Sequence, residues 1–299
     1  MSELRQDPIT HDWVIINPER AKRPHDGDGG ECPFCPGNEA LMPQETDRID
    51  DAQGNWLVRS APNRYPTLDV ERRAAVRYSE VPEGWRRLPA YGQHEVIVES
   101  PQHDATLASL PVERLRDVLE LYARRFRVLA ALAGVARHVV LFKNQGRRAG
   151  TSLSHPHAQI VATPVVSPEV RNRTQEEVAI FDSTGHCGMC HVVGRELGGG
   201  ERVVHRSAHF VTLAPYASRV PWQIQIVPLR HAPTFAEVNG RSRHVGVAVL
   251  VGADAIRMRK AEELSDAPCI DQICCVHGWH DLGSLQPLTV EWQACSLGP

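Results

Sequence analysis

The sequence contains no apolar run of the roughly 18 residues that a membrane-spanning helix needs. Its first residues, Met1 to Asp7, also lack the apolar core of a secretory signal peptide. Neither charge is in large excess, since 33 Lys and Arg residues oppose 36 Asp and Glu residues and the formal net charge is −3. A chain without a strong positive field is not built for general binding of nucleic acid or anionic membranes. We therefore expect a cytoplasmic protein whose partners are neither nucleic acids nor membranes.

The eight cysteines indicate metal ligands rather than disulfides, because disulfides are rare in a reducing compartment. Two of them, Cys32 and Cys35, form a Cys-x-x-Cys pair that supplies half of a tetrahedral zinc site. His103 and His155 are candidates for the other half, because each follows a strand or loop that can converge on the pair. A redox pair or a chance pair of cysteines is the alternative interpretation.

A second Cys-x-x-Cys pair, Cys187 and Cys190, predicts a second zinc site together with His231. The fourth ligand of this site is not identified by the sequence. Fifteen histidines are a high count for 299 residues and are typical of metal or general-base chemistry. We therefore expect zinc as the cofactor, with one site predicted more strongly than the other.

Apolar periodicity predicts an α+β fold. Residues 110–133 predict an amphipathic helix, because their apolar side chains recur at spacings of three and four. Five short segments carry strand patterns: 13–16, 56–59, 94–99, 138–143 and 155–162. The glycine-punctuated segment 144–154 predicts a loop between the last two strands, which we expect to form an antiparallel pair.

The second half of the chain partly repeats the first. Residues 95–110 align with residues 223–238, since each stretch begins with an alternating strand and carries a histidine eight positions later and a threonine three beyond it. Each stretch also follows a Cys-x-x-Cys pair. The repeat predicts two tandem domains, residues 1–170 and 171–299, each an antiparallel sheet with packed helices. Chance similarity of two short amphipathic strands is the alternative.

The predicted duplication is incomplete near the C-terminus. The point that matches His155 lies near residue 283, and no His-x-His sequence occurs there; the nearest histidines are His277 and His280. We therefore expect the second copy to be degenerate or incomplete after about residue 240, to pack poorly there, and to hold an incomplete second metal site.

A polar row on a strand is the strongest chemical signal. Side chains two residues apart on a strand face the same side, so His155, His157 and Gln159 are predicted to form a row with roughly 6–7 Å between neighbours. Such a row beside apolar residues is costly unless it has partners, which favours a site over a solvated strand face. In the preceding loop, Gly146 and Ser152 suit a phosphate, although a flexible hairpin loop has the same composition.

These residues resemble the signature of the galactose-1-phosphate uridylyltransferase family, in the histidine-triad superfamily. The resemblance covers roughly residues 4–238 and rests on elements that occur in the family's order: Asp7 to Thr10, Trp13 to Ile16, Pro18 to Pro24, Cys32 with Cys35, Ser100 to His103, and Asn144 to Gln159. Lys143 departs from members that carry an acidic residue at that position, and the family's late His-x-His ligands and hexose-phosphate contacts have no match after residue 240.

The resemblance implies transfer of a uridylyl group from UDP-glucose to galactose 1-phosphate through a covalent uridylyl-histidine on His157. Gln159 would hydrogen-bond the phosphoryl oxygens. Six further residues are implied as substrate contacts: Arg20, Arg23, Asn63, Asn144, Gly150 and Ser152. The first metal site would be structural, and the enzyme is expected to be a homodimer whose small-molecule partners are a nucleotide sugar and a hexose 1-phosphate.

Two other functions are compatible with the sequence. The same histidine also serves a phosphorylase or hydrolase of ADP-glucose or of a dinucleotide polyphosphate, and no residue pattern distinguishes uracil from adenine. The other function, of a different class, is an inactive binding module stabilised by zinc. An intact row of histidines and glutamine argues against it, because a module that only binds does not need a nucleophile.

Overall fold

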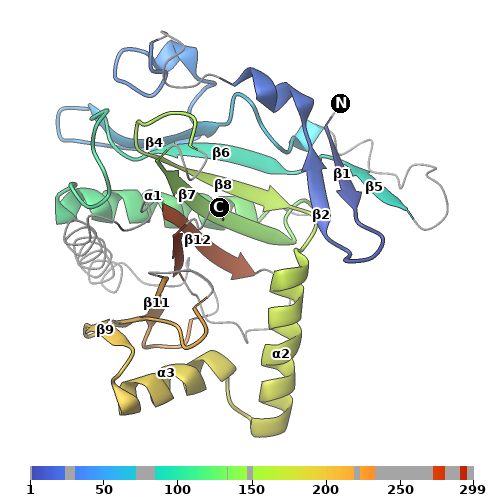
Figure 1. Cartoon of the computed structure of the whole chain (residues 1–299). Coiled ribbons are helices and arrows are strands. Elements are labelled where there is room, and N and C mark those ends of the chain that lie inside the picture. Colours follow the sequence, from blue (N-terminus) through green and yellow to red (C-terminus); the bar gives the residue numbers. More distant parts are fainter. Residues whose placement is uncertain are drawn as a thin grey trace, which may run out of the picture.

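The computed structural model describes residues 2–23, 31–71, 85–132, 134–146, 151–218, 223–232, 272–279 and 290–294, the last two ranges as backbone. Within these ranges, no helix combines the length and the apolar character that crossing a membrane requires. The described part of the chain mixes helices with antiparallel strands, as the sequence predicts (Figure 1).

A ten-stranded antiparallel sheet carries most of the described strands. Its order from one edge to the other is β3 (Asp47–Asp50), β4 (Trp56–Pro62), β6 (Gln93–Val98), β8 (His157–Thr163), β7 (His138–Gln145), β12 (Gln272–Trp279), β13 (Val290–Ala294), β11 (Ile224–Pro228), β10 (Phe210–Leu213) and β9 (Val203–Arg206). Strands before residue 170 fill one half of the sheet and strands after it fill the other.

The two halves of the sheet meet where β7 pairs with β12, in a register that runs from Gln145 opposite Gln272 to His138 opposite Trp279. Counting outward from this seam, β6 and β11 occupy matching positions, and they are the two strands that the sequence repeat aligns. This order is compatible with the predicted duplication, which stays a prediction, as does the weak packing expected after residue 240. Residues 233–271 and 280–289 lie outside the described part of the chain.

The other described elements flank this sheet. A small sheet has the order β2 (Trp13–Ile16), β1 (Glu3–Gln6), β5 (Arg86–Pro89). Two 3₁₀ helices, η1 (Pro18–Lys22) and η2 (Glu39–Leu41), lie between β2 and β5 in the chain. Helix α2 (Pro168–Thr184) begins after Ser167, whose hydroxyl accepts a hydrogen bond from the Val170 N–H, and ends at Gly185 with a φ of 71°. Helix α2 leads into α3 (Gly188–Gly199). The predicted domain boundary at residue 170 falls in the first turn of α2.

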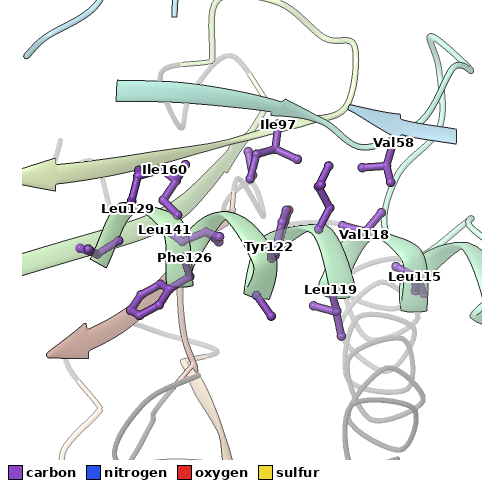
Figure 2. Packing of buried hydrophobic residues seen from close by; sticks show 14 of the residues in the cluster. Val58, Ile97, Leu115, Val118, Leu119, Tyr122, Phe126, Leu129, Leu141 and Ile160 are labelled. Atoms are coloured by element: carbon purple, nitrogen blue, oxygen red, sulfur yellow. The ribbon is translucent and has the colours of Figure 1, made fainter. Parts of the chain in front are cut away.

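Helix α1 (Val112–Ala130) supplies the largest hydrophobic core, within the predicted 110–133. Its buried face includes Leu121, Phe126 and Leu129, each at most 1% exposed, and Figure 2 shows α1 running beneath strands that carry Ile97 and Ile160. Burying each such side chain contributes about 1.5–3 kcal/mol relative to leaving it in water. The helix therefore fixes one face of the strands whose other face carries the candidate site.

Alternation along β8 assigns its side chains to the two faces of the sheet. Ala158 and Ile160 belong to the core between α1 and the sheet, whereas His157 and Gln159 line a cavity on the opposite face. Strand β8 begins at His157, two residues later than the start that the sequence predicts at His155. Pro156 has no N–H to contribute to a ladder, which is one physical reason for the later start.

Candidate functional site

The cavity on this face has a volume of about 1010 Å³ and is lined by residues far apart in the sequence. It brings together seven of the eight residues predicted for catalysis or substrate binding: Arg20, Arg23, Asn63, Asn144, Ser152, His157 and Gln159. The eighth, Gly150, lies outside the described residues. The lining residues include three arginines, Arg20, Arg23 and Arg64, whose guanidinium groups make the cavity suited to an anionic ligand.

Several elements contribute these side chains. His157 and Gln159 come from β8, and Asn144 comes from the end of the neighbouring β7. Arg20 lies in η1, where its Nη1 donates to the Tyr65 carbonyl at 2.8 Å. Neighbouring strands therefore hold His157, Gln159 and Asn144 on the same face of the sheet. Helix η1 places the guanidinium group of Arg20 in the same cavity.

His157 has one ring nitrogen engaged and one open. Its Nδ1 lies 2.8 Å from the His155 carbonyl oxygen, which can only accept, so Nδ1 carries the proton and Nε2 keeps its lone pair. Burial, reinforced by the nearby Lys143 charge, lowers the pKa of His157 to about 4, so the imidazole is neutral at pH 7. The Phe34 ring packs against it with centroids 5.1 Å apart. His157 is therefore a neutral imidazole whose orientation is fixed by the His155 carbonyl and the Phe34 ring.

His155 belongs to a different site from His157. The predicted row of three side chains is wrong at this residue, because His155 precedes β8 and is not among the residues that line the cavity. Its Nδ1 lies 3.7 Å from Cys32 Sγ and 3.6 Å from Cys35 Sγ, and the side chain is fully buried. The two histidines share a short segment of chain but face different partners.

Cys32, Cys35, His103 and His155 form a group whose ligand atoms all lie within 4.8 Å of one another. The Cys35 Sγ to His103 Nδ1 distance is 3.3 Å. A tetrahedral zinc ion, with bonds of about 2.3 Å to sulfur and about 2.0 Å to nitrogen, separates such atoms by about 3.5 Å. The four predicted ligands therefore have the chemistry and spacing of a structural zinc site.

The far nitrogen of each histidine supports this assignment. The Nε2–H of His155 donates to the Ser100 carbonyl at 2.8 Å, which leaves Nδ1 unprotonated toward the sulfurs. His103 Nε2 lies 3.1 Å from Ser154 Oγ. Metal-bound histidines usually make such a second contact, which fixes the ring and its tautomer.

The second predicted metal group is also assembled in part. The ligand atoms of Cys187, Cys190 and His231 lie within 4.8 Å of one another, and Cys190 Sγ is 3.4 Å from His231 Nδ1. Cys187 stands at the start of α3, one residue before its first turn. Among the described residues, no fourth His, Cys, Asp or Glu joins these three.

Sequence reasoning missed His94, which lies on β6 beside Gln159. Its Nε2 is 3.0 Å from Gln159 Oε1, and its Nδ1 accepts a hydrogen bond from the Thr67 backbone N–H at 3.0 Å. The only available signal was the alternation along 94–99, which puts His94 on the face opposite Glu95. That signal does not distinguish a cavity from a solvated face.

A buried ion pair lies beside the backbone of His157. Lys143 Nζ is 2.6 Å from Glu99 Oε2 and also donates to the His157 carbonyl at 3.3 Å. Glu99 accepts a second hydrogen bond from the Tyr122 hydroxyl on α1. Lys143 is therefore not a surface cation, and the partner that makes it tolerable in the core is Glu99.

Comparison with known proteins gives consistent results. Residues 1–167 match the family model of the galactose-1-phosphate uridyl transferase N-terminal domain. The chain is 34% identical over 278 residues to the ADP-glucose phosphorylase of Arabidopsis thaliana, covering 89% of this chain and 76% of that protein. It is 30% identical over 250 residues to the galactose-1-phosphate uridylyltransferase of Thermotoga maritima, covering 84% and 74%.

Solved structures show the same two similarities. A uridylyltransferase structure superposes with a TM-score of 0.79 at 28% identity, covering 98% of this chain and 87% of that one. The ADP-glucose phosphorylase of Arabidopsis thaliana with bound ADP-glucose superposes with a TM-score of 0.75 at 30% identity, covering 100% of this chain and 91% of that one.

Proposed function

This chain belongs to the galactose-1-phosphate uridylyltransferase family, and from that premise we propose that it transfers a uridylyl group from UDP-glucose to galactose 1-phosphate. His157 is the nucleophile of the proposed reaction. The observation that carries the proposal is the state of this residue, a neutral imidazole whose Nδ1 is held by the His155 carbonyl and whose Nε2 is available inside the cavity.

The proposed reaction has two displacements at phosphorus. In the first, the lone pair of His157 Nε2 forms a bond to the α-phosphorus, the bond from that phosphorus to the β-phosphate bridging oxygen breaks, and glucose 1-phosphate leaves with the electron pair. In the second, a phosphate oxygen of galactose 1-phosphate attacks the same phosphorus and the N–P bond breaks. No net proton transfer is required, and the proton stays on His157 Nδ1, hydrogen-bonded to the His155 carbonyl, throughout.

The other cavity residues supply binding and charge stabilisation. Arg20 and Arg23 attract the phosphates, and Ser152 and Asn144 offer hydrogen bonds to them. Gln159 donates to a phosphoryl oxygen as negative charge builds on it. His157 is buried, and a buried position strengthens such electrostatic interactions relative to bulk solvent.

We propose that zinc is held by Cys32, Cys35, His103 and His155 as a structural ion, since their ligand atoms have the spacing described above. Zinc would fix the chain two residues before the nucleophile. The same cysteine turn carries Phe34, which packs on His157. The metal group thus acts on the reaction by positioning.

ADP-glucose phosphorolysis is the second candidate, and one observation favours it. The relative with 34% identity is an ADP-glucose phosphorylase, and its alignment covers more of this chain than that of the Thermotoga uridylyltransferase. The chemistry at His157 would be unchanged, with an adenylyl group in place of uridylyl and inorganic phosphate as the acceptor.

A covalent-labelling experiment tests the proposal. The purified protein is incubated with UDP-glucose or ADP-glucose, each labelled at the α-phosphate, and protein-bound label is counted before and after addition of acceptor. We expect label from UDP-glucose that galactose 1-phosphate releases as UDP-galactose. Label from ADP-glucose that inorganic phosphate releases as ADP supports the second candidate instead, and no protein-bound label from either substrate contradicts both.

Two histidine variants are matched controls for this experiment. His157→Ala is expected to keep its zinc content and folding but to lose transfer by many orders of magnitude, because no other group forms the intermediate. His155→Ala, two residues earlier, is expected to lose zinc and stability together. Ordinary turnover by His157→Ala would show that another group is the nucleophile.

A further inference from the structure

His94 lies between the side-chain amide of Gln159 and the backbone N–H of Thr67. On the antiparallel pair of β6 and β8, His94 stands opposite Val161, and Gln159 stands opposite Val96, so the two residues are diagonal neighbours on one face. Both side chains line the cavity, and His94 is only 3% exposed. A buried polar ring in this position needs defined hydrogen-bond partners.

The partners of His94 determine where its proton is. A backbone N–H can only donate, so the 3.0 Å contact from the Thr67 N–H requires an unprotonated Nδ1. The Thr67 hydroxyl lies 3.1 Å from the same nitrogen. Burial, together with the charge of Arg20, lowers the pKa of His94 to about 3, so the ring is neutral at pH 7. A neutral ring with Nδ1 unprotonated carries its proton on Nε2.

That proton fixes the orientation of the Gln159 amide. The Nε2–H of His94 donates to Gln159 Oε1 at 3.0 Å, and the opposite orientation would set an NH₂ group against an N–H. The Asn63 Nδ2 also lies 3.1 Å from His94 Nε2, but it too is a donor, because Asn63 Oδ1 accepts from the Tyr65 N–H at 2.8 Å. The side-chain oxygens of Gln159 and Asn63 therefore each accept a hydrogen bond from the protein, and the NH₂ group of Gln159 is left to donate to another partner.

We infer that His94 is a positioning residue, which holds the Gln159 amide so that its NH₂ group donates to the phosphoryl oxygen that gains charge during transfer. This inference rests on the proposed function, in which Gln159 stabilises that charge. A preorganised donor needs no reorientation at the moment of reaction, which is the source of its catalytic effect. His94 itself touches no reacting atom.

A double-mutant cycle tests this role. His94→Leu, His94→Gln and Gln159→Ala are made singly, and His94→Leu is combined with Gln159→Ala. The rate of covalent labelling is measured in single turnovers with α-labelled UDP-glucose and ADP-glucose. We expect His94→Leu to slow labelling about tenfold, the factor that one neutral buried hydrogen bond carries, with a smaller change in the half-saturating substrate concentration. In the Gln159→Ala background the same change should have no further effect.

His94→Gln is the conservative rescue, because its amide N–H can donate to Gln159 Oε1 from a similar position, and we expect labelling within about threefold of the natural protein. Equal losses from His94→Leu in both backgrounds would overturn the inference and leave only a structural role. Absence of label on the natural protein is a different outcome, since it contradicts the proposed function itself.

A spectroscopic measurement on the natural protein does not depend on turnover. Two-bond ¹⁵N–¹H correlation spectra of the natural protein, labelled with [¹⁵N]histidine, report the tautomer of each ring, and the resonance of His94 is assigned by its loss in His94→Gln. We expect the Nε2–H tautomer at pH 7. The Nδ1–H tautomer would overturn the inference, because Nε2 then has no proton to donate to Gln159.

Discussion

Replacing Lys143 by methionine should destabilise the fold far more than a surface charge change does. Lys143 and Glu99 are 5% and 0% exposed in their side chains, and their charged atoms lie 2.6 Å apart. Methionine is close to lysine in length and shape, so packing changes little. The change removes the cation and leaves a carboxylate without its charge partner in the core.

The expected magnitude follows from what remains around Glu99. Removing one partner of a buried pair typically costs about 3–5 kcal/mol, because the other charge is left uncompensated. Glu99 keeps one hydrogen bond, from the Tyr122 hydroxyl, which places the expectation near the lower end, about 3 kcal/mol. Against a total stability of about 5–15 kcal/mol, that is a substantial fraction.

Urea unfolding at pH 7, followed by circular dichroism, measures the effect. The matched control is the double variant Lys143→Met with Glu99→Gln, which removes both charges and keeps an acceptor for Tyr122. We expect it to recover at least half of the loss, because no charge is then buried alone. A loss below about 1 kcal/mol in the single variant, or an equally unstable double variant, would falsify this account of the pair.

Three further predictions concern the metal group and the cavity. Cys35→Ser should lower the zinc content, measured by elemental analysis, and the melting temperature with it; unchanged zinc would argue against the site. Gln159→Ala should slow covalent labelling about 10²–10³-fold without loss of zinc, and an unaffected rate would remove Gln159 from the mechanism. The pKa of His94 is lowered to about 3 in the folded chain, so its protonation favours the unfolded chain at acid pH. The natural protein should therefore lose about 2 kcal/mol through His94 between pH 7 and pH 5, a part of the pH dependence that His94→Gln lacks in urea titrations; identical pH dependence would contradict the burial of a neutral ring.

Elements with a clear apolar period could be predicted from the sequence, and elements without one could not. The spacing of apolar residues over 110–133 predicts α1, and the alternation over 94–99 predicts β6, because each buries a continuous face. By contrast, β3 (Asp47–Asp50) at a sheet edge and the charged β5 (Arg86–Pro89) carry little apolar signal. Their pairing comes from tertiary neighbours, which local sequence does not encode.

The candidate site was predictable where residue chemistry is distinctive and unpredictable where geometry decides. Two cysteines three residues apart predict a metal group at any fold position, and histidines beside a glycine-rich loop predict phosphate chemistry. The start of β8 could not be predicted in this way. His155 lies before the strand, where Pro156 offers no N–H to a ladder and the His155 ring contacts the sulfur of Cys35. His94 was missed because its tautomer is set by Thr67, which lies 27 residues away in the chain.

A backbone contact to one ring nitrogen gives each of His94, His155 and His157 a different role. The Thr67 N–H meets His94 Nδ1, so the proton of His94 is on Nε2 and the ring donates to an amide. The Ser100 carbonyl accepts from His155 Nε2, so Nδ1 is left as a lone pair that faces the sulfurs. The carbonyl of His155 accepts from His157 Nδ1, so Nε2 keeps the lone pair that the proposed reaction needs. In each ring the contacted nitrogen decides what the other nitrogen can do, and the contact comes from a backbone group whose donor or acceptor character no side-chain substitution alters. The role of each histidine thus depends on where the fold places a peptide group. A high histidine count therefore suggests metal or general-base chemistry, but the fold decides which histidine has which role.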